Sequence, residues 1–585
     1  MYVSKTERHS MYLRKTKTKD KRIYLSIAHS YRRSDGTNTA KTVKSLGYVD
    51  DFIAQGIKDP ISHFKAVCKE MNENAAKENE PVLIKFFPKK KIDTRNCNQI
   101  ELGSAIPSAY FHRVLGIWDF FEKKRTSRKF KYDPCRILEM LVWDRISHPS
   151  SKLEAWQNKD KYPRKCDFGI NDVYRCLTYL QKNAAALVKS MNEAYENVKG
   201  KRNKTKLYYD VTNYYFEIDY EDEGEEGLRK RGVSKEHRPN PIVQMGLLLD
   251  GDGMPFDYEI FPGNVNDMQT MMPIMKKAKL REDLENEHII VVADKGLNTS
   301  NNIASCVLDG NGFIFSQSVR KATKQLKKWV LNQDGYEQNE AGTFKIKSRF
   351  SEKIVHIEGD DGKKHDVKIP VKEVAFWSKN FYDRSRHERL KVIKKSSDAI
   401  KRADYSSACA HSKIRYAKDV PFVKETGEVA VHNWVLDEQK IARDEEMDGY
   451  YCIITSEENM PDDEVIRTYR GLSKIEESFR VMKSDFDARP VFCSTEDHIK
   501  AHFLICYVAL FIMRLMQFDT DKKHSATEIS KSLSQVVGHK MDANCYLFDY
   551  YNEVVSDLSK AVSVDLSKQM LTKSQIRKIM ASVKK

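Results

Sequence analysis

Three carboxylates stand out by their positions in the sequence. Asp210 follows a run of apolar and aromatic residues on a predicted strand, and Asp294 ends the apolar run 289–293. Because active sites gather at the carboxyl ends of strands in α/β sheets, Asp294 lies at a position that suits catalysis. Glu476 lies much later, on a predicted helix at about 462–484. Each acid alone also fits a plainer interpretation, which is a cap or turn for a strand-end Asp and a solvated helix face for Glu476.

Together the three acids indicate a metal-dependent reaction. Phosphodiester cleavage commonly uses two divalent ions about 3.5–4 Å apart, one activating the nucleophile and one stabilising the leaving oxygen. Mg²⁺ and Mn²⁺ prefer carboxylate oxygens and keep several waters. The arrangement is an Asp on a first strand, an Asp after a fourth strand and a Glu on a late helix. This is the arrangement of a ribonuclease H-like nuclease core.

The predicted helix around Glu476 adds a phenol and two cations. Steps of three, four, four and three residues place five side chains close to one helix face, namely Tyr469, Leu472, Glu476, Arg480 and Lys483. A carboxylate between a phenol and cations is a plausible surface for handling phosphate.

The elements that must position these acids alternate between strands and helices. Residues 207–319 predict the order β-β-β-α-β-α-β, with a hairpin turn at Gly251-Asp252-Gly253. Residues 321–447 interrupt this order with short strands and one charged helix near 383–402. A strand at 450–456 and the helix that carries Glu476 follow. The sequence therefore predicts an α/β (α+β multidomain) protein whose core is split by a β-rich insertion.

The charge of the chain favours a polyanionic partner. Its 585 residues contain 100 Lys and Arg against 84 Asp and Glu, a net charge of +16. Residues 1–200 contain 39 basic and 23 acidic residues, whereas residues 201–585 contain 61 of each. The whole excess thus precedes the first carboxylate, and we expect residues 1–200 to bind DNA separately from the acids.

The first 200 residues divide into a strand-rich and a helical part. Two predicted strands flank Ser34-Asp35-Gly36, which indicates a hairpin with a basic face. From 98 to 200 the pattern is helical, with one helix opened by Asp133-Pro134 and another running from about 171 to Met191. Short helices between basic loops suit a helix-turn-helix module. A solvated strand pair and an ordinary helical subdomain remain the alternatives.

The remaining composition points to a cytoplasmic, nucleoid-associated protein without a membrane segment. The eleven cysteines are scattered and never form Cys-x-x-Cys, which indicates reduced thiols. The apolar run from Phe503 to Met513 is about half a membrane span and suits a buried core helix. His498 and His502 are four residues apart, but without a third ligand we expect buried, hydrogen-bonded histidines rather than a metal site.

The segment around Glu476 and several others resemble a known protein family. The segment YRGLSKIEESFRVMK is similar to the third-acid signature Y-x2-R-x3-E-x6-K of DDE transposases from insertion sequences. Tyr469, Glu476 and Lys483 match it, whereas Leu472 replaces its Arg, a role for which Arg470 and Arg480 are candidates. Seven further segments resemble the insertion-sequence 1634 branch of the insertion-sequence 4 superfamily. They are SYRRSDG, DRISHPSSK, LYYDVTNYYFE, GLLLDGDGMPFDYEIFPGNVNDMQT, VVADKGL, DGYYCIITS and HIKAHFLICYVAL.

The resemblance implies a DNA transposase with a ribonuclease H-like core. Asp210, Asp294 and Glu476 would be catalytic and would bind two Mg²⁺ or Mn²⁺ ions, and Tyr469, Arg480 and Lys483 would contact DNA. An insertion-domain Trp that stacks on a base is also implied, with Trp329, Trp377 and Trp434 as candidates beside their role as core residues. The basic residues expected to contact DNA near the N-terminus are Arg32, Arg33, Lys123, Lys124, Arg125 and Lys152.

The predicted activity is cleavage at the terminal inverted repeats of a transposon and joining of the 3′-OH ends to target DNA, by a homodimer or larger assembly. The alternatives are a ribonuclease H-like nuclease or resolvase without strand transfer, a domesticated DNA-binding protein, and, less suited to the basic first third, a two-carboxylate glycosidase. The end sequence, the target preference and the excision route stay open. The expected domains are 1–95 (basic hairpin), 96–200 (helical, DNA-binding), 201–320 (first half of the core), 321–447 (insertion), 448–520 (second half of the core) and 521–585 (helical tail).

Overall fold

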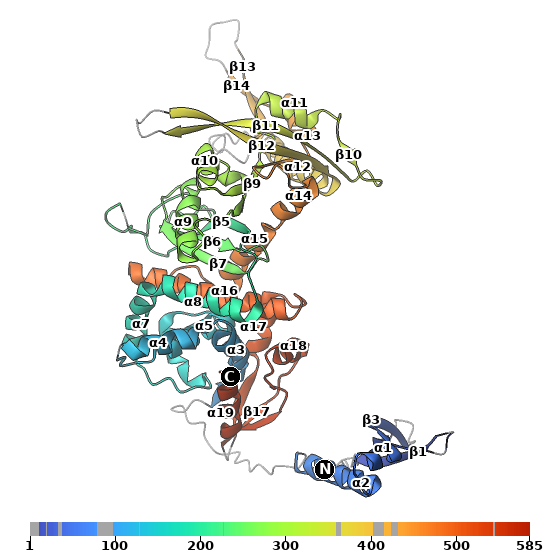
Figure 1. Ribbon diagram of the computed structural model, residues 1–585. Helices are drawn as coiled ribbons and strands as arrows, with labels where there is room; N and C mark the ends of the chain where they lie inside the picture. Colours follow the sequence, from blue (N-terminus) through green and yellow to red (C-terminus); the bar gives the residue numbers. More distant parts are fainter. Residues whose placement is uncertain are drawn as a thin grey trace. The chain divides into compact units, whose positions relative to one another are not determined.

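The chain folds as two compact units, Met1–Ile92 and Asp93–Lys585 (Figure 1). The computed structural model describes residues 11–18, 20, 22–32, 38–78, 98–127, 129–225, 227–358, 364–401, 415–422, 431–541 and 544–584. The mixed α/β class expected from the sequence is confirmed, because helices alternate with the strands of one large sheet in the second unit.

The first unit is a three-stranded antiparallel sheet with two helices. The strands are β1 (Met11–Lys17), β2 (Ile23–Arg32) and β3 (Asn38–Tyr48), and the helices are α1 (Val49–Ala54) and α2 (Pro60–Glu78). The predicted hairpin corresponds to β2 and β3, and its tip, Ser34-Asp35-Gly36, lies outside the described residues. The amide of Asn72 on α2 bonds the backbone N and O of Met11 at 2.7 and 2.8 Å, which fixes the unpredicted β1 against α2.

The second unit is built on a nine-stranded sheet of order β10-β11-β12-β15-β9-β8-β5-β6-β7. β5 runs antiparallel to β6 and parallel to β8, and β8 runs parallel to β9. The predicted order β-β-β-α-β-α-β is confirmed. Its elements are β5 (Lys206–Tyr215), β6 (Ile242–Leu249), β7 (Pro255–Pro262), α9 (Met271–Arg281), β8 (Ile290–Ala293), α10 (Ser300–Leu308) and β9 (Gly312–Gln317).

The interrupting segment extends this sheet. β11 (Phe344–Glu358) pairs with β12 (Lys364–Ser378), and β12 pairs with β15 (Tyr450–Thr455) beside β9. The two short strands expected at 343–358 are one strand, because β12 supplies partners along its whole length. The other elements of this segment are α11 (Lys324–Leu331), β10 (Glu337–Gln338), α12 (Lys379–Lys401), β13 (Ala417–Phe422), β14 (Val431–Leu436) and α13 (Glu438–Glu446).

A long apolar helix, α16 (Glu496–Asp519), lies between the sheet and the helices before it (Figure 1). It contacts β7, α5 (Pro134–Ser147) and α7 (Ile170–Lys182). The helix is long and apolar enough to cross a membrane, but it is mostly buried inside the protein. The expectation of a buried core helix at Phe503 to Met513 is therefore confirmed.

The helices before β5 belong to the core of the second unit. Residues of α5, α7, α8 (Ala184–Lys199), α16 and β6 form one buried apolar cluster. The single helix expected from about 171 to Met191 is two helices, α7 and α8, which meet at Asn183. The remaining helices here are α3 (Ala105–Ala109), α4 (Ile117–Ser127) and α6 (Lys152–Gln157). The division between the two compact units falls at Ile92, and the helices before β5 pack in the core of the second unit, so residues 1–200 do not form one compact unit.

The helix expected at 462–484 is interrupted. It consists of α14 (Asp462–Arg470), α15 (Ser473–Arg480) and a π-helical turn at Val481–Asp485. The break lies at Gly471, where a Cβ would come within 2.2 Å of the Tyr208 hydroxyl, and i→i+3 hydrogen bonds tighten the backbone there. The close approach of β5 therefore requires a glycine at this break, which the spacing of the helix residues did not indicate.

The C-terminal tail is not purely helical. Its helices are α17 (Ala526–Ser534), α18 (Glu553–Ala561) and α19 (Lys573–Ser582). Three short strands, β16 (Val537–Lys540), β17 (Cys545–Phe548) and β18 (Met570–Thr572), form a sheet with β4 (Gln99–Glu101). This sheet joins the tail to the start of the second unit. A capping box of Thr572 and Gln575 begins α19.

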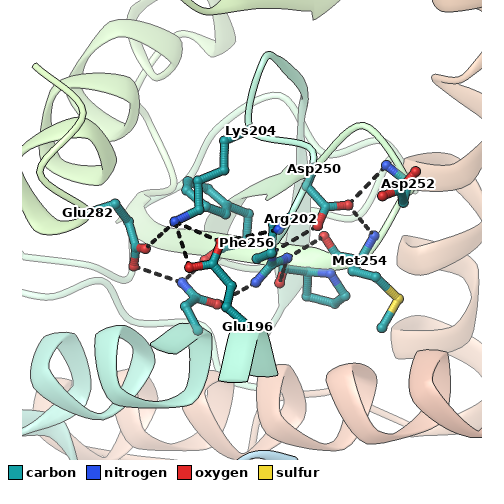
Figure 2. A network of polar contacts seen from close by, with 10 residues as sticks. Glu196, Arg202, Lys204, Asp250, Asp252, Met254, Phe256 and Glu282 are labelled. Carbon is teal, nitrogen blue, oxygen red and sulfur yellow. Dashed lines mark hydrogen bonds and ion pairs between the residues drawn. The ribbon is translucent and has the colours of Figure 1, made fainter. Parts of the chain in front are cut away.

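A polar network, called the Arg202 network below, joins α8 to the nine-stranded sheet (Figure 2). The Arg202 guanidinium donates to Asp250 at 2.8 Å, to the Asn192 amide oxygen at 2.5 Å and to the carbonyls of Met254 and Pro255. In the same network the Lys204 amine forms ion pairs with two carboxylates, those of Glu196 and Glu282. The network ties the helical region to the β6–β7 hairpin.

Candidate active site

Two of the three predicted acids lie side by side on the central strands. In the parallel pair of β5 and β8, Tyr208 is opposite Val292, so the chain direction brings Asp210 next to Asp294 just past the end of β8. Neighbouring strands lie about 4.8 Å apart. Burial raises the pKa of Asp210 to about 6, and the negative charge of Asp294 adds to this rise. The pair therefore consists of a half-buried carboxylate, Asp210, beside an exposed one, Asp294.

Asp294 is oriented by two hydroxyl groups. The Ser316 Oγ on β9 and the Tyr469 hydroxyl on α14 both donate to Asp294 Oδ1, each at 2.9 Å. Burial raises the pKa of Tyr469, and the charge of Asp294 raises it further, which keeps the phenol protonated as a donor. The structure thus places Tyr469, predicted to contact DNA, directly on the Asp294 carboxylate.

Glu476 lies on α15 with its side chain exposed. Burial raises the pKa of Tyr451 on β15, and the charges of Asp294 and Glu476 both add to that rise, so the two acids act on the same neighbourhood. Within the described part of the chain, no three His, Cys, Asp or Glu side chains are grouped closely enough to hold a metal ion. The donor chemistry of Asp210 and Asp294 nevertheless fits a hard divalent ion, since Mg²⁺ typically uses one or two carboxylates and keeps water and phosphate ligands.

Two lysine amines, those of Lys483 and Lys235, lie near the carboxylate pair. The Lys483 amine donates to Thr212 Oγ1 at 2.7 Å and lies 3.4 Å from Glu236 Oε1. Burial lowers its pKa to about 8, and the nearby positive charge of Lys235 lowers it further. Lys235 donates to the Val211 carbonyl at 2.8 Å, directly beside Asp210. The site therefore has two amines next to its acids.

Sequence reasoning missed several of these groups. Lys235 and Glu236 lie in a loop between β5 and β6, where no periodicity marks them, and the basic run around SKEHR was their only signal. Asp267, in the turn before α9, also raises the pKa of Asp210 through its charge. Loop residues of this kind are positioned by the sheet, so their convergence follows from the topology.

The predicted stripe on the Glu476 helix is divided between core and surface. Leu472 is buried in the main apolar cluster, so the position of the signature Arg is part of the hydrophobic core. Arg480 is exposed and lies 3.6 Å from Asp485. Arg470 is exposed as well, with its guanidinium over the Phe344 ring. The break at Gly471 separates Tyr469 from the other members of the stripe.

The basic residues predicted near the N-terminus have different surroundings. Arg32 ends β2, and Arg33 lies outside the described residues. The three on α4 differ among themselves: Lys123 is exposed, Lys124 lies near the Phe120 ring, and Arg125 forms ion pairs with Glu122 and Asp133. Lys152 is buried and therefore presents no amine at the outer surface.

The three tryptophans lie in or beside the sheet extension. Trp329 on α11 is covered by the Arg349 guanidinium, 4.3 Å from the ring centre. Trp377 on β12 donates its indole N–H to the Asp448 carbonyl at 3.1 Å. Trp434 lies on β14, opposite Asp419. All three are partly buried, and a role in base stacking stays a prediction.

The rings of His498 and His502 make different contacts. His498 stacks on Tyr174 with ring centres 5.9 Å apart. His502 is buried and lies 3.1 Å from the Ala488 carbonyl and 3.2 Å from the Lys152 amine. The expected hydrogen-bonded burial is thus confirmed for His502.

Comparison with known proteins assigns two regions of the chain. Residues 13–82 match the N-terminal domain of IS1634 family transposases, and residues 229–512 match the transposase DDE domain. Together these regions span more than half of the chain, and the second contains Asp294 and Glu476 but begins after Asp210. No curated protein matches the chain. One similar solved structure is a "Cryo-EM structure of piggyBac transposase synaptic complex with hairpin DNA", with 8% identity, 84% of this chain and 86% of that chain covered, and a TM-score of 0.34.

Proposed function

Because this chain belongs to the IS1634 family of transposases and carries a DDE domain, we propose that it cleaves the ends of its insertion sequence and joins the freed 3′-OH ends to target DNA. The observation that carries the proposal is the pairing of Asp210 and Asp294 at neighbouring strand ends, where the negative charge of Asp294 adds to the rise in the pKa of Asp210. Two carboxylates held together in this way need a cation to balance them, which suits metal-dependent phosphodiester chemistry.

We further propose that the core is ribonuclease H-like. The order β9-β8-β5-β6-β7, with three antiparallel strands followed by two parallel ones, supports this assignment. The insertion at 321–447 would split the core between Asp294 and Glu476. The boundaries near 95, 200, 320, 447 and 520 are part of the same proposal, with the end-binding surface in the first unit.

The residues around the carboxylates would have distinct roles. Asp210, Asp294 and Glu476 would hold two Mg²⁺ or Mn²⁺ ions, which when bound lower the pKa of water and neutralise charge on the phosphate. Tyr469 and Ser316 would keep Asp294 oriented by their hydrogen bonds. Lys483 and Lys235 would bind the phosphate near the scissile bond, and Arg480 would contact the strand beside it.

The first unit would bind the terminal inverted repeats. It contains 20 Lys and Arg against 10 Asp and Glu, so most of the net charge of +16 lies there. Electrostatic binding of this kind weakens steeply with salt. Full-length protein should therefore show a steeper salt dependence of DNA binding than residues 93–585. Two ends must be processed together, which favours a homodimer or larger assembly acting in the cytoplasm on nucleoid DNA.

The test is a cleavage and strand-transfer assay with full-length protein and a DNA that carries the terminal repeats. Asp210→Asn, Asp294→Asn and Glu476→Gln should each lower cleavage by at least about a thousandfold, as loss of groups that stabilise the transition state does, while end binding is retained. Unchanged cleavage in these variants would refute the site. Pre-cut ends that are not joined to a target plasmid would instead favour a nuclease or resolvase.

A further inference from the structure

A cavity of about 560 Å³ lies outside the carboxylate site, between the segment that precedes α6 and the segment that precedes α16. Pockets of this size suit small ligands or single nucleotide groups. Three cations, Arg145, Lys152 and Arg489, and the ring of Phe492 belong to its walls. Its acidic residues, Glu154 and Asp487, are both exposed.

Lys152 is buried in this cavity wall, where burial lowers the pKa of its amine, and it forms no ion pair with a carboxylate among the residues that the structure describes. Lys152 is only 8% exposed. Among the described residues, its amine forms a hydrogen bond with His502 Nδ1 at 3.2 Å. An ammonium group can only donate, so His502 Nδ1 accepts and the protonated Nε2 donates to the Ala488 carbonyl. Burial lowers the pKa of His502 well below its usual value, which keeps the imidazole neutral. His502 therefore supplies no negative charge.

Arg145 is the second buried cation and is 3% exposed. Its guanidinium donates to the carbonyls of Phe486, Asp487 and Ser150, and its Nε has no hydrogen-bond partner. The nearest acid in sequence, Asp144, accepts two hydrogen bonds from Ser150 instead of forming an ion pair with Arg145. In the described part of the chain neither cation forms an ion pair with a carboxylate, and the charge of Asp144 acts on both only from a distance.

Buried charges without counter-ions are costly, because they lose their hydration without a compensating partner. A cavity beside them lets a ligand supply the missing negative charge. The third cation, Arg489, is already paired with Glu236, and Glu236 also lies 3.4 Å from the Lys483 amine. The cavity and the carboxylate site are therefore linked through one shared glutamate.

We propose that this cavity, called the Lys152 pocket below, binds a phosphodiester group of the DNA strand that continues from the cleavage site. Lys152 and Arg145 supply the positive charge, and Phe492, 70% exposed, offers a face for the adjoining sugar or base. The proposal rests on the transposase function for the identity of the ligand. The charge imbalance that supports it does not depend on catalysis.

The experiment measures thermal unfolding of the full chain with inorganic phosphate and with chloride at equal ionic strength. Because phosphate stabilises proteins in general by exclusion, the readout is the difference between variants. Wild type should gain several degrees more in phosphate than Lys152→Met, and Lys152→Met should melt no lower than wild type in chloride. Lys152→Gln is a second neutral variant, and Lys531→Met on the exposed face of α17 should respond like wild type.

A second measurement connects the pocket to DNA. Lys152→Met should weaken binding of a terminal-repeat oligonucleotide about five- to tenfold, the loss of roughly one charge-assisted contact, and the oligonucleotide should abolish the extra stabilisation by phosphate in wild type. A response to phosphate without weakened DNA binding would identify a pocket for free phosphate and overturn the DNA assignment. An unchanged phosphate response, or a large fall in melting temperature in chloride, would overturn the pocket itself.

Asp294→Asn separates this proposal from the proposed function. That variant should lose cleavage and keep the phosphate response, because Asp294 does not line the pocket. If Asp294→Asn cleaves DNA normally while Lys152→Met loses the phosphate response, the function fails and the pocket stands.

Discussion

The Arg202 network and the Lys152 pocket each contain a buried guanidinium and a lysine amine in the second unit, but they balance the charges differently. Arg202 contacts the Asp250 carboxylate and Lys204 contacts Glu196 and Glu282 (Figure 2). Arg145 contacts only backbone carbonyls, and Lys152 contacts a neutral imidazole. The network is closed by its own carboxylates, whereas the pocket leaves its cations beside a cavity.

This difference separates a structural from a binding role. In the Arg202 network the guanidinium also lies over the rings of Tyr195, Phe256 and Phe511, so charge and packing are both satisfied inside the protein. In the pocket the hydrogen bonds of the protein leave net positive charge for a ligand. A buried cation therefore indicates a binding site when its partners are neutral and a cavity adjoins it.

The largest expected effect is on the closed network. Arg202→Met should lower the free energy of unfolding by about 3–5 kcal/mol, because it leaves Asp250 buried without its partner. Urea denaturation of the full chain measures this. Arg467→Met, which removes an exposed pair with Asp463, should change stability by less than about 1 kcal/mol. Equal effects of the two substitutions would remove the basis of the comparison.

The next effect concerns pH and Asp144, which accepts hydrogen bonds from Ser150 in the wall of the pocket. Burial raises the pKa of Asp144 to about 6, above its value of about 3.9 in the unfolded chain. The folded state thus disfavours the ionised form, and wild type loses stability as the pH rises from about 4 to about 6. Asp144→Asn avoids this loss, so its stability relative to wild type should improve by about 1–3 kcal/mol between pH 4 and pH 7. A relative stability that stays constant over this range would contradict the prediction.

The smallest effect compares two lysines that are both 8% exposed, Lys372 and Lys152. Lys372 pairs with Asp462 at 2.7 Å, whereas Lys152 has no carboxylate partner. Lys372→Met should cost about 1–2 kcal/mol, a modest value because Asp462 is partly exposed and begins α14. Lys152→Met should cost nothing. Chemical denaturation of both variants decides this, and a greater loss for Lys152→Met would reverse the assignment of the two regions.

The alternating order of the core and the position of its acids could be predicted from the sequence. Runs of β-branched and aromatic residues indicated β5 to β9. Asp294 stood out because it directly follows the apolar run 289–293. The core helix at Phe503–Met513 was equally clear, because its apolar run is too short for a membrane and too long for a strand. These features are local, so their residues carry the signal themselves.

Other features depend on partners distant in the sequence. Gly471 is needed where the helix passes close to Tyr208 on β5, and Tyr469 meets its hydrogen-bond acceptor, Asp294, from 175 residues away. The interior location of Lys152 follows from α16, which brings His502 to it from 350 residues away. The sequence by itself determined which residues are acidic, basic or apolar and how each element repeats. Only the tertiary structure decided which charges are neutralised, because a counter-ion is chosen by distance in space.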